Sequence, residues 1–127
     1  ARSGAGFLHE AAADEISERL IDVNRTFTQP AIVTAFPEFW ARLAPDARLV
    51  APDETLALGE GAHDLVIHAM ALHWADDPVG QIVQCRRALR PDGLFLGACL
   101  GGETLSELRA ALAEAEVAEV VVRLALE

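Results

Sequence analysis

The pattern of hydrophobic positions is organised around residues 62–74, a nearly apolar run with valine and isoleucine at its centre. Turn residues bound this run on both sides, at 59–61 and at 75–78. A short apolar run that is rich in β-branched residues and lies between turns is typical of a strand buried on both faces. Because ligands bind beyond the carboxyl ends of central strands in open parallel sheets, we expect residues 69–74 to lie at the rim of a pocket.

Further elements are predicted on either side of this run. Ile16, Leu20 and Val23 recur at helical spacing and predict a helix over 7–23, an arm that packs against the rest of the chain or against a partner. The other predicted elements are a strand within 26–36 that begins at Pro30, a helix over 38–43 behind Pro37, a strand at 48–51, a helix that begins at Pro78 behind the N-cap Asp77, a turn at 90–93, a strand over 94–100, a helix over 104–117 and a strand at 120–122.

This alternation of strands and helices predicts an α/β fold with a mainly parallel sheet. We expect one domain, with a helical arm at 1–25, a sheet domain at 26–118 and a fragment of an incomplete C-terminal part at 119–127. No turn signal separates the predicted last helix from the predicted last strand, so we expect residues to be missing around Ala118 and Glu119. Because the chain does not begin with methionine, we expect it to start inside a longer one.

The charge of the chain narrows the classes of partner. The formal net charge is −10, and all ten basic residues are arginines. An acidic chain is a poor match for nucleic acid and for anionic membranes. We therefore expect no nucleic-acid partner and no membrane insertion, since no apolar run approaches the length of a membrane span. The charge favours solubility over an acidic docking surface.

The two cysteines, Cys85 and Cys99, are too few for a disulfide framework or a zinc site. They are typical of small buried residues in a reducing compartment. The expected localisation is therefore the cytoplasm.

Three segments carry a resemblance to a known family: His-Asp-Leu-Val at 63–66, Leu-His-Trp at 72–74 and Leu-Arg-Pro-Asp-Gly-Leu-Phe at 89–95. Together they resemble the class I S-adenosylmethionine-dependent methyltransferases of type 11. The block at 100–109, which contains Gly-Gly-Glu-Thr-Leu, is similar to the branch that holds malonyl-carrier-protein methyltransferases and a mitochondrial complex I assembly factor. The arm at 15–27 also fits the entry helix of that branch.

The resemblance implies a Rossmann-like methyltransferase sheet, here contracted or incomplete, with an N-terminal helical arm. A strand and a helix of the family are missing between Leu43 and Arg48. In the family, the loop after the first strand is rich in glycine, which lets backbone N–H groups approach the carboxypropyl tail of the cofactor. This chain has Val-Thr-Ala-Phe-Pro at 33–37 instead, with a degenerate glycine motif.

The resemblance also implies a set of site residues for the cofactor S-adenosylmethionine and for the substrate. The implied cofactor-binding residues are Thr34, Ala35, Phe36, Asp53, Glu54, His68, Ala69 and Met70. The implied substrate-facing residues are Leu72, His73 and Trp74. Asp53 and Glu54 stand beside the position of an acid near the adenine, where they either bond the adenine amine or ribose or form a solvated turn.

His73 and Trp74 carry the candidate chemistry. His73 is the candidate catalytic base, and Trp74 is placed to stack on a substrate or on the sulfonium. The alternative, slightly favoured, is a packing pair that caps the core. His63, His68 and His73 are spaced by five residues, so they alternate between the faces of a strand and are not expected to share a metal.

Two functions from different classes remain open. The first is methyl transfer from S-adenosylmethionine to a small acid or a carrier-bound acyl group. The second is a non-enzymatic scaffold that has lost cofactor binding and acts through a protein partner, as in the assembly of respiratory complex I. The assembly-factor resemblance also permits a third reading, side-chain hydroxylation.

Overall fold

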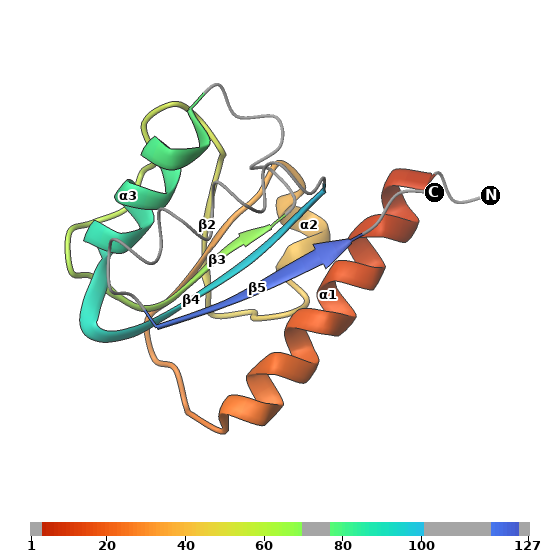
Figure 1. Cartoon of the computed structure of the whole chain (residues 1–127), viewed down its shortest axis with the longest axis horizontal. Coiled ribbons are helices and arrows are strands. Elements are labelled where there is room, and N and C mark those ends of the chain that lie inside the picture. The colour runs from red at the N-terminus through yellow and green to blue at the C-terminus, as the bar shows by residue number, and fades with distance from the viewer. Residues whose placement is uncertain (1–3, 70–76, 101–117, 125–127) are drawn as a thin grey trace.

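The computed structural model of the protein describes residues 4–69, 77–100 and 118–124, and its elements are shown in Figure 1. In chain order they are helix α1 (Gly4–Val23), strand β1 (Pro30–Val33), helix α2 (Pro37–Trp40), strand β2 (Arg48–Val50), strand β3 (His63–Ala69), helix α3 (Pro78–Ala88), strand β4 (Leu89–Leu100) and strand β5 (Ala118–Leu124). The predicted strands at 48–51 and 120–122 are therefore confirmed. The predicted helix over 104–117 lies outside the described residues.

The described strands form one sheet in the order β2-β1-β3-β4-β5, and every neighbouring pair is parallel. The predicted α/β fold with a parallel sheet is confirmed. Strand β3 lies at the centre, and all seven of its residues are buried. The central position predicted for the apolar run at 62–74 is also confirmed, although residues 70–74 lie outside the described part.

Two hydrophobic clusters cover the two faces of the sheet. One joins α3 to the sheet through Ile82 and Cys85, which pack with Val66 of β3. The other joins α1 and α2 through Ile16 and Trp40, which pack with Ile67 of β3. Figure 1 shows α1 and α3 on opposite sides of the strands. Because neighbouring residues of a strand point to opposite faces, the continuous apolar sequence of β3 supplies both clusters.

The turns around β3 explain where it begins. Gly61 has a φ of +61°, a conformation that glycine adopts without the steric cost of a side chain. Its N–H donates to the carbonyl of Arg87 at 2.8 Å, which ties the end of α3 to the entrance of β3. The turn predicted at 59–61 is thus present.

The prediction of a turn at 90–93, with the next strand starting at 94, is wrong. Strand β4 begins at Leu89 and runs through these residues. Leu89 pairs with His63, while Leu94 pairs with Leu65, so residues 90–93 form an irregular bulge within the ladder. Proline cannot donate to a ladder and is tolerated at such bulges. A Cβ on Gly93 would lie 3.0 Å from the backbone oxygen of Arg90, a tight contact, so the bulge favours glycine there.

Helix α1 packs on the sheet domain through a buried aromatic cluster. Trp40 Nε1 donates a hydrogen bond of 2.9 Å to His9 Nδ1, and both side chains are buried. The His9 ring also makes edge contacts with Phe36 and Phe39, at centroid distances of 4.6 and 5.9 Å. Burial lowers the pKa of His9. The helical arm predicted from Ile16 and its neighbours therefore docks on its own chain.

Asp64 fastens the entrance of β1 to β3. Its two carboxylate oxygens accept backbone hydrogen bonds from Thr28, at 2.7 Å, and from Gln29, at 2.9 Å. Burial alone would raise the pKa of Asp64, but these hydrogen bonds to the charged form bring the pKa below its ordinary value. The acid at the start of the apolar run is thus a structural link at the amino end of the sheet.

The link at Asp64 predicts the effect of Asp64→Asn. An amide oxygen replaces only one of the two acceptors, so the free energy of unfolding should fall by about 1–3 kcal/mol in urea titrations at pH 7. Because the pKa of Asp64 is lowered, this contribution is complete above its ordinary value of 3.8 and is lost as the pH falls through the lowered pKa. The matched control is Asp22→Asn on the exposed surface of α1, and equal losses in both variants would contradict the account.

The link at His9 predicts a pH dependence. Since its pKa is lowered from 6.5 in the folded chain, the unfolded chain takes up the proton first, and stability should fall as the pH drops below about 6.5. Protonation also removes the Nδ1 acceptor for Trp40. His9→Gln keeps an acceptor that does not titrate, so urea titrations at pH 7.5 and pH 5.5 should show a smaller loss in this variant. A loss as large as that of the original chain would refute this role of His9.

Candidate functional site

The described candidate residues lie at the carboxyl ends of three adjacent strands. Thr34, Ala35 and Phe36 follow β1, and Asp53 and Glu54 lie in the loop after β2. His68 and Ala69 are the last two residues of β3. Since β2, β1 and β3 are neighbours and parallel, these ends meet at one edge of the sheet, as the prediction requires.

The loop after β1 uses its own backbone donors. The N–H of Thr34 donates to the carbonyl of Val50 at 2.9 Å, and the N–H of Phe36 donates to Thr34 Oγ1 at 2.9 Å. Pro37 has no N–H and begins α2, a helix of four residues. Thr34 is buried, while Ala35 and Phe36 are exposed. This turn therefore does not fit the carboxypropyl tail of S-adenosylmethionine in the way that a glycine-rich turn would.

The loop after β2 is held from below by two glutamines of α3. Gln81 Nε2 donates to the carbonyl of Asp53 at 2.8 Å, and Gln84 Nε2 donates to the carbonyl of Glu54 at 2.9 Å. Gln84 Oε1 also accepts the N–H of Leu56 at 2.7 Å. The residues Asp53 and Glu54 are themselves exposed. Two carboxylates on a fixed backbone fit hydroxyl or amine donors, such as those of a ribose or an adenine.

His68 lies behind this loop rather than on its surface. Its side chain is completely buried, and its Nε2 lies 2.6 Å from Oε1 of Gln81, which is also buried. His63, at the other end of β3, bonds instead to the carbonyl of Gln29 through Nδ1 at 3.0 Å. The two histidines thus have different partners at opposite ends of the strand.

The start of α3 sets the position of these glutamines. Asp77 accepts the N–H of Gly80 at 2.9 Å, and Pro78 is the first helical residue, which confirms the predicted cap. A Cβ on Gly80 would collide with the Asp77 carboxylate in its capping position, so this cap favours glycine. The capped first turn brings Gln81 under the loop after β2.

Sequence reasoning missed Gln81 and Gln84 as site residues. Both lie on a helix whose apolar positions were used to predict only its packing face. The available signal was the spacing of the two amides, which lie three residues apart on one side of the helix that begins behind Asp77. The predictions for Met70, Leu72, His73 and Trp74 fall outside the described residues and stay predictions.

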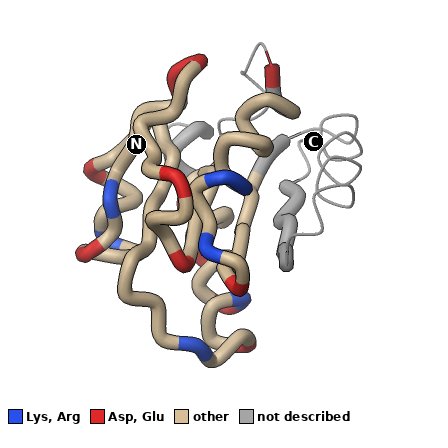
Figure 2. Tube along the Cα trace, turned by 90° about the vertical axis from the view of Figure 1, so that its left-hand side faces the viewer, with Lys and Arg blue, Asp and Glu red and all other residues tan. Residues whose placement is uncertain are grey.

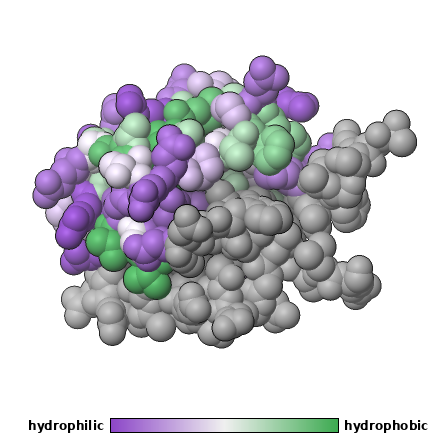
Figure 3. All heavy atoms as spheres, turned by 90° about the horizontal axis from the view of Figure 1, so that it is seen from above, coloured by the Kyte–Doolittle hydropathy of each residue, from purple (hydrophilic) through white to green (hydrophobic). Residues whose placement is uncertain are grey.

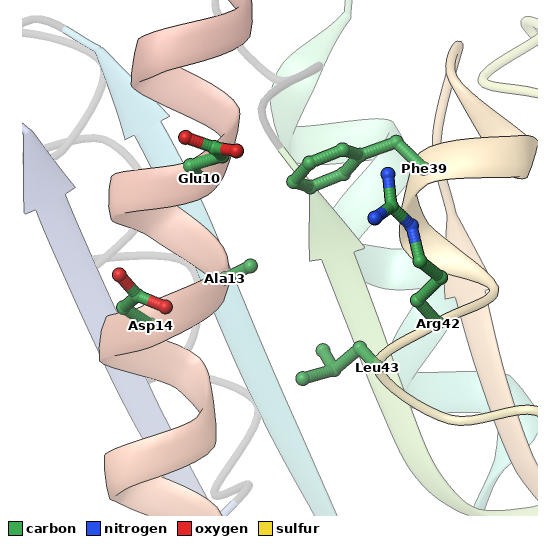
Figure 4. Close-up of a pocket in the computed structure, with 6 residues that line it drawn as sticks. All are labelled: Glu10, Ala13, Asp14, Phe39, Arg42 and Leu43. Carbon is green, nitrogen blue, oxygen red and sulfur yellow. The ribbon is translucent and has the colours of Figure 1, made fainter.

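Two hollows among the described residues are lined by none of the candidate site residues. One, of about 430 Å³, lies between α1 and α2, and Figure 4 shows Glu10 and Asp14 on one side of it and Phe39 and Arg42 on the other. The other, of about 470 Å³, is at the amino ends of the strands and is lined by residues that include Arg48 and His63. The described parts of the chain contain no cluster of three or more metal-ligating side chains.

The surface of the described residues is mixed in character. Acidic residues lie on several separate segments of the trace in Figure 2, with arginines between them. Polar and apolar residues are interspersed on the coloured part of the face in Figure 3. No helix within the described ranges is long and apolar enough to span a bilayer.

A parallel α/β sheet with candidate residues at the carboxyl edge defines a class of protein that binds ligands beyond its strand ends. Within this class, a family model described as a methyltransferase domain matches residues 3–97, so the chain belongs to the methyltransferase domain family. The family suspected from the segments at 63–66, 72–74 and 89–95 is thereby confirmed.

Curated relatives lie in the same branch. The chain is 42% identical over 73 residues to a protein of Danio rerio named mitochondrial arginine-hydroxylase NDUFAF5, a match that covers 58% of this chain and 23% of that protein. It is 44% identical over 60 residues to a malonyl-[acyl-carrier protein] O-methyltransferase of Laribacter hongkongensis, covering 47% of this chain and 20% of that protein. The chain thus spans about a fifth to a quarter of these relatives.

A solved structure supports the fold. A protein of unknown function from Methanothermobacter thermautotrophicus superposes with a TM-score of 0.52 over 93% of this chain and 88% of its own, at 14% sequence identity. At that identity the likeness concerns the fold alone.

Proposed function

We propose that the chain carries the nucleoside half of an S-adenosylmethionine site and serves methyl transfer to a small acid or a carrier-bound acyl group. The observation that supports this proposal is the exposed pair Asp53 and Glu54, held by Gln81 and Gln84 beside the end of the central strand. The acyl substrate class comes from the relative named malonyl-[acyl-carrier protein] O-methyltransferase. The proposed partners are accordingly a small-molecule or carrier-bound substrate.

In this proposal each residue has a limited task. Asp53 and Glu54 accept hydrogen bonds from ribose hydroxyls or an adenine amine. When bound, S-adenosylmethionine supplies a methyl group that is already activated for transfer. A carboxylate substrate is ionised at neutral pH and needs mainly alignment and exclusion of water. His73 then acts as a base only for a substrate that must lose a proton, and Trp74 stacks on the substrate.

The proposed compartment is a reducing one such as the cytoplasm. Cys85 is a buried free thiol, and burial raises its pKa to about 12. At neutral pH such a thiol stays protonated and unreactive, as expected of a cysteine with a packing role.

A second candidate is a non-enzymatic scaffold that acts on a protein partner in the assembly of a respiratory complex. The observation that favours it is the turn at 34–37, where the N–H of Thr34 is bonded to Val50 and the N–H of Phe36 is bonded to Thr34 Oγ1. The relatives named arginine-hydroxylase NDUFAF5 are the reason to test this candidate and, beside it, hydroxylation of an arginine side chain.

Calorimetric titration with S-adenosylmethionine separates the first two candidates. The enzyme proposal predicts a dissociation constant in the micromolar range, about −8 kcal/mol. Joint substitution of Asp53→Asn and Glu54→Gln should weaken binding by about tenfold or more, because two charged acceptors are lost. The control pair, Asp46→Asn with Glu60→Gln, removes the same charges from exposed residues nearer the amino ends of the strands and should leave binding unchanged. The absence of both binding heat and a thermal shift at millimolar ligand would favour the scaffold.

A turnover assay tests the substrate-facing residues. With a substrate that must lose a proton, His73→Gln combined with Trp74→Leu should reduce methyl transfer by at least about 100-fold, the lower range for loss of a positioned proton acceptor. The midpoint of urea unfolding should change little, since the pair is proposed to face substrate. If the original chain is active and this double variant is equally active, the assignment of both residues to the substrate site is wrong.

A further inference from the structure

We propose that Gln81 is a positioning residue of the candidate site, which fixes the proton of His68 on Nε2 and thereby sets the loop of Asp53 against the end of β3. The affinity part of this inference rests on the proposed function. The hydrogen-bond part rests only on contacts within the described residues.

The orientation of the Gln81 amide follows from its two partners. The carbonyl oxygen of Asp53 only accepts hydrogen bonds, so the group that faces it at 2.8 Å must be the NH2 of Gln81. The amide oxygen of Gln81 then faces His68 Nε2 at 2.6 Å. The flipped amide would bring two oxygens together at the Asp53 end, so the hydrogen-bond network selects one orientation.

This orientation fixes the proton on His68. An amide oxygen has no proton to donate, so His68 Nε2 must be the donor in the contact with Gln81. Because His68 is completely buried and Gln81 is 4% exposed, water does not replace this bond at low cost. The imidazole, the amide and the loop carbonyl therefore form one chain of hydrogen bonds from β3 to the loop after β2.

The consequence for the site is a coupling between two strand ends. The loop that presents Asp53 and Glu54 follows β2, the outermost strand on one side of the described sheet. The Gln81 chain connects this margin to the central strand, whose end carries His68 and Ala69. Gln84 holds the same loop through Glu54 and Leu56. Gln84 therefore serves as a natural comparison, since it bonds to the same loop at Glu54 and Leu56 and these two bonds do not involve His68.

The experiment compares Gln81→Met, Gln81→Glu and Gln84→Met with the original chain. Nitrogen NMR shifts of the His68 ring, measured without ligand, report which ring nitrogen carries the proton. We expect Nε2–H in the original chain, in Gln84→Met and in Gln81→Glu, which keeps an acceptor. We expect a shift toward the other tautomer or a mixture in Gln81→Met. An unchanged His68 spectrum in Gln81→Met overturns the proposal, because a residue that only fills space would give this result.

Titration with S-adenosylmethionine is the second arm. Gln81→Met and Gln81→Glu should each weaken binding by about tenfold, since both lose the donor to the Asp53 carbonyl. Urea titrations in parallel identify any variant that fails to fold. If Gln81→Met fails to fold, the affinity of Gln81→Glu decides this arm. Unchanged affinity in both Gln81 variants overturns the positioning role.

The two measurements distinguish failure of the proposed function from failure of this inference. If the original chain gives no heat with S-adenosylmethionine, the enzyme proposal fails. The His68 spectra of the ligand-free variants then decide the role of Gln81 by themselves.

Discussion

The structure depends on the burial of β3 on both faces at the centre of a parallel sheet. Burying a Val, Leu or Ile side chain contributes about 1.5–3 kcal/mol, and β3 supplies such side chains to the cluster under α3 and to the cluster under α1. The two clusters hold helices on both faces, which leaves the ends of the strands as the place for ligands. The polar residues of β3 follow the same constraint: Asp64 and His68 are buried and bonded to backbone or to a buried amide.

Much of this architecture was predictable because it depends on local signals. The apolar run around Val66 identified the central strand, and Asp77 with Pro78 identified the start of α3 to the residue. Pro30 marked the start of β1. The bulge at 90–93 was not predictable from its sequence, since proline, aspartate and glycine read as a turn. Only the pairing of Leu89 with His63, a contact between distant segments, carries the strand through it.

The candidate site was predictable to a lesser degree. Strand ends could be assigned from the order of elements, which brought Thr34, Asp53 and His68 to one edge. The hydrogen bonds that hold them were not predictable, because the amide pair of Gln81 and Gln84 marks one side of a helix without identifying the residues to which it bonds. Gln81 bonds to His68 and to Asp53 across 13 and 28 residues of sequence, so its role appears only once the fold brings them together.

The methyltransferase domain family and the local geometry support the two halves of a cofactor site unequally. The nucleoside half, at the loop after β2, is better supported than the half for the carboxypropyl tail, at the turn after β1. The loop after β2 offers fixed, exposed carboxylates. In the turn after β1, the N–H of Thr34 is bonded to Val50 of β2 and the N–H of Phe36 is bonded to Thr34 Oγ1. The proposed binding of S-adenosylmethionine therefore lies on the nucleoside side, at the loop after β2, and the turn after β1 has a structural role in this proposal.

The most direct test of this account is a map of backbone amide shifts by NMR as S-adenosylmethionine is added to the intact chain. The account predicts that among the described residues the largest changes fall at 53–56 and at 68–69, at the carboxyl edge beside the central strand. Changes centred instead on the hollow of Glu10 and Phe39, or on that of Arg48 and His63, would contradict it.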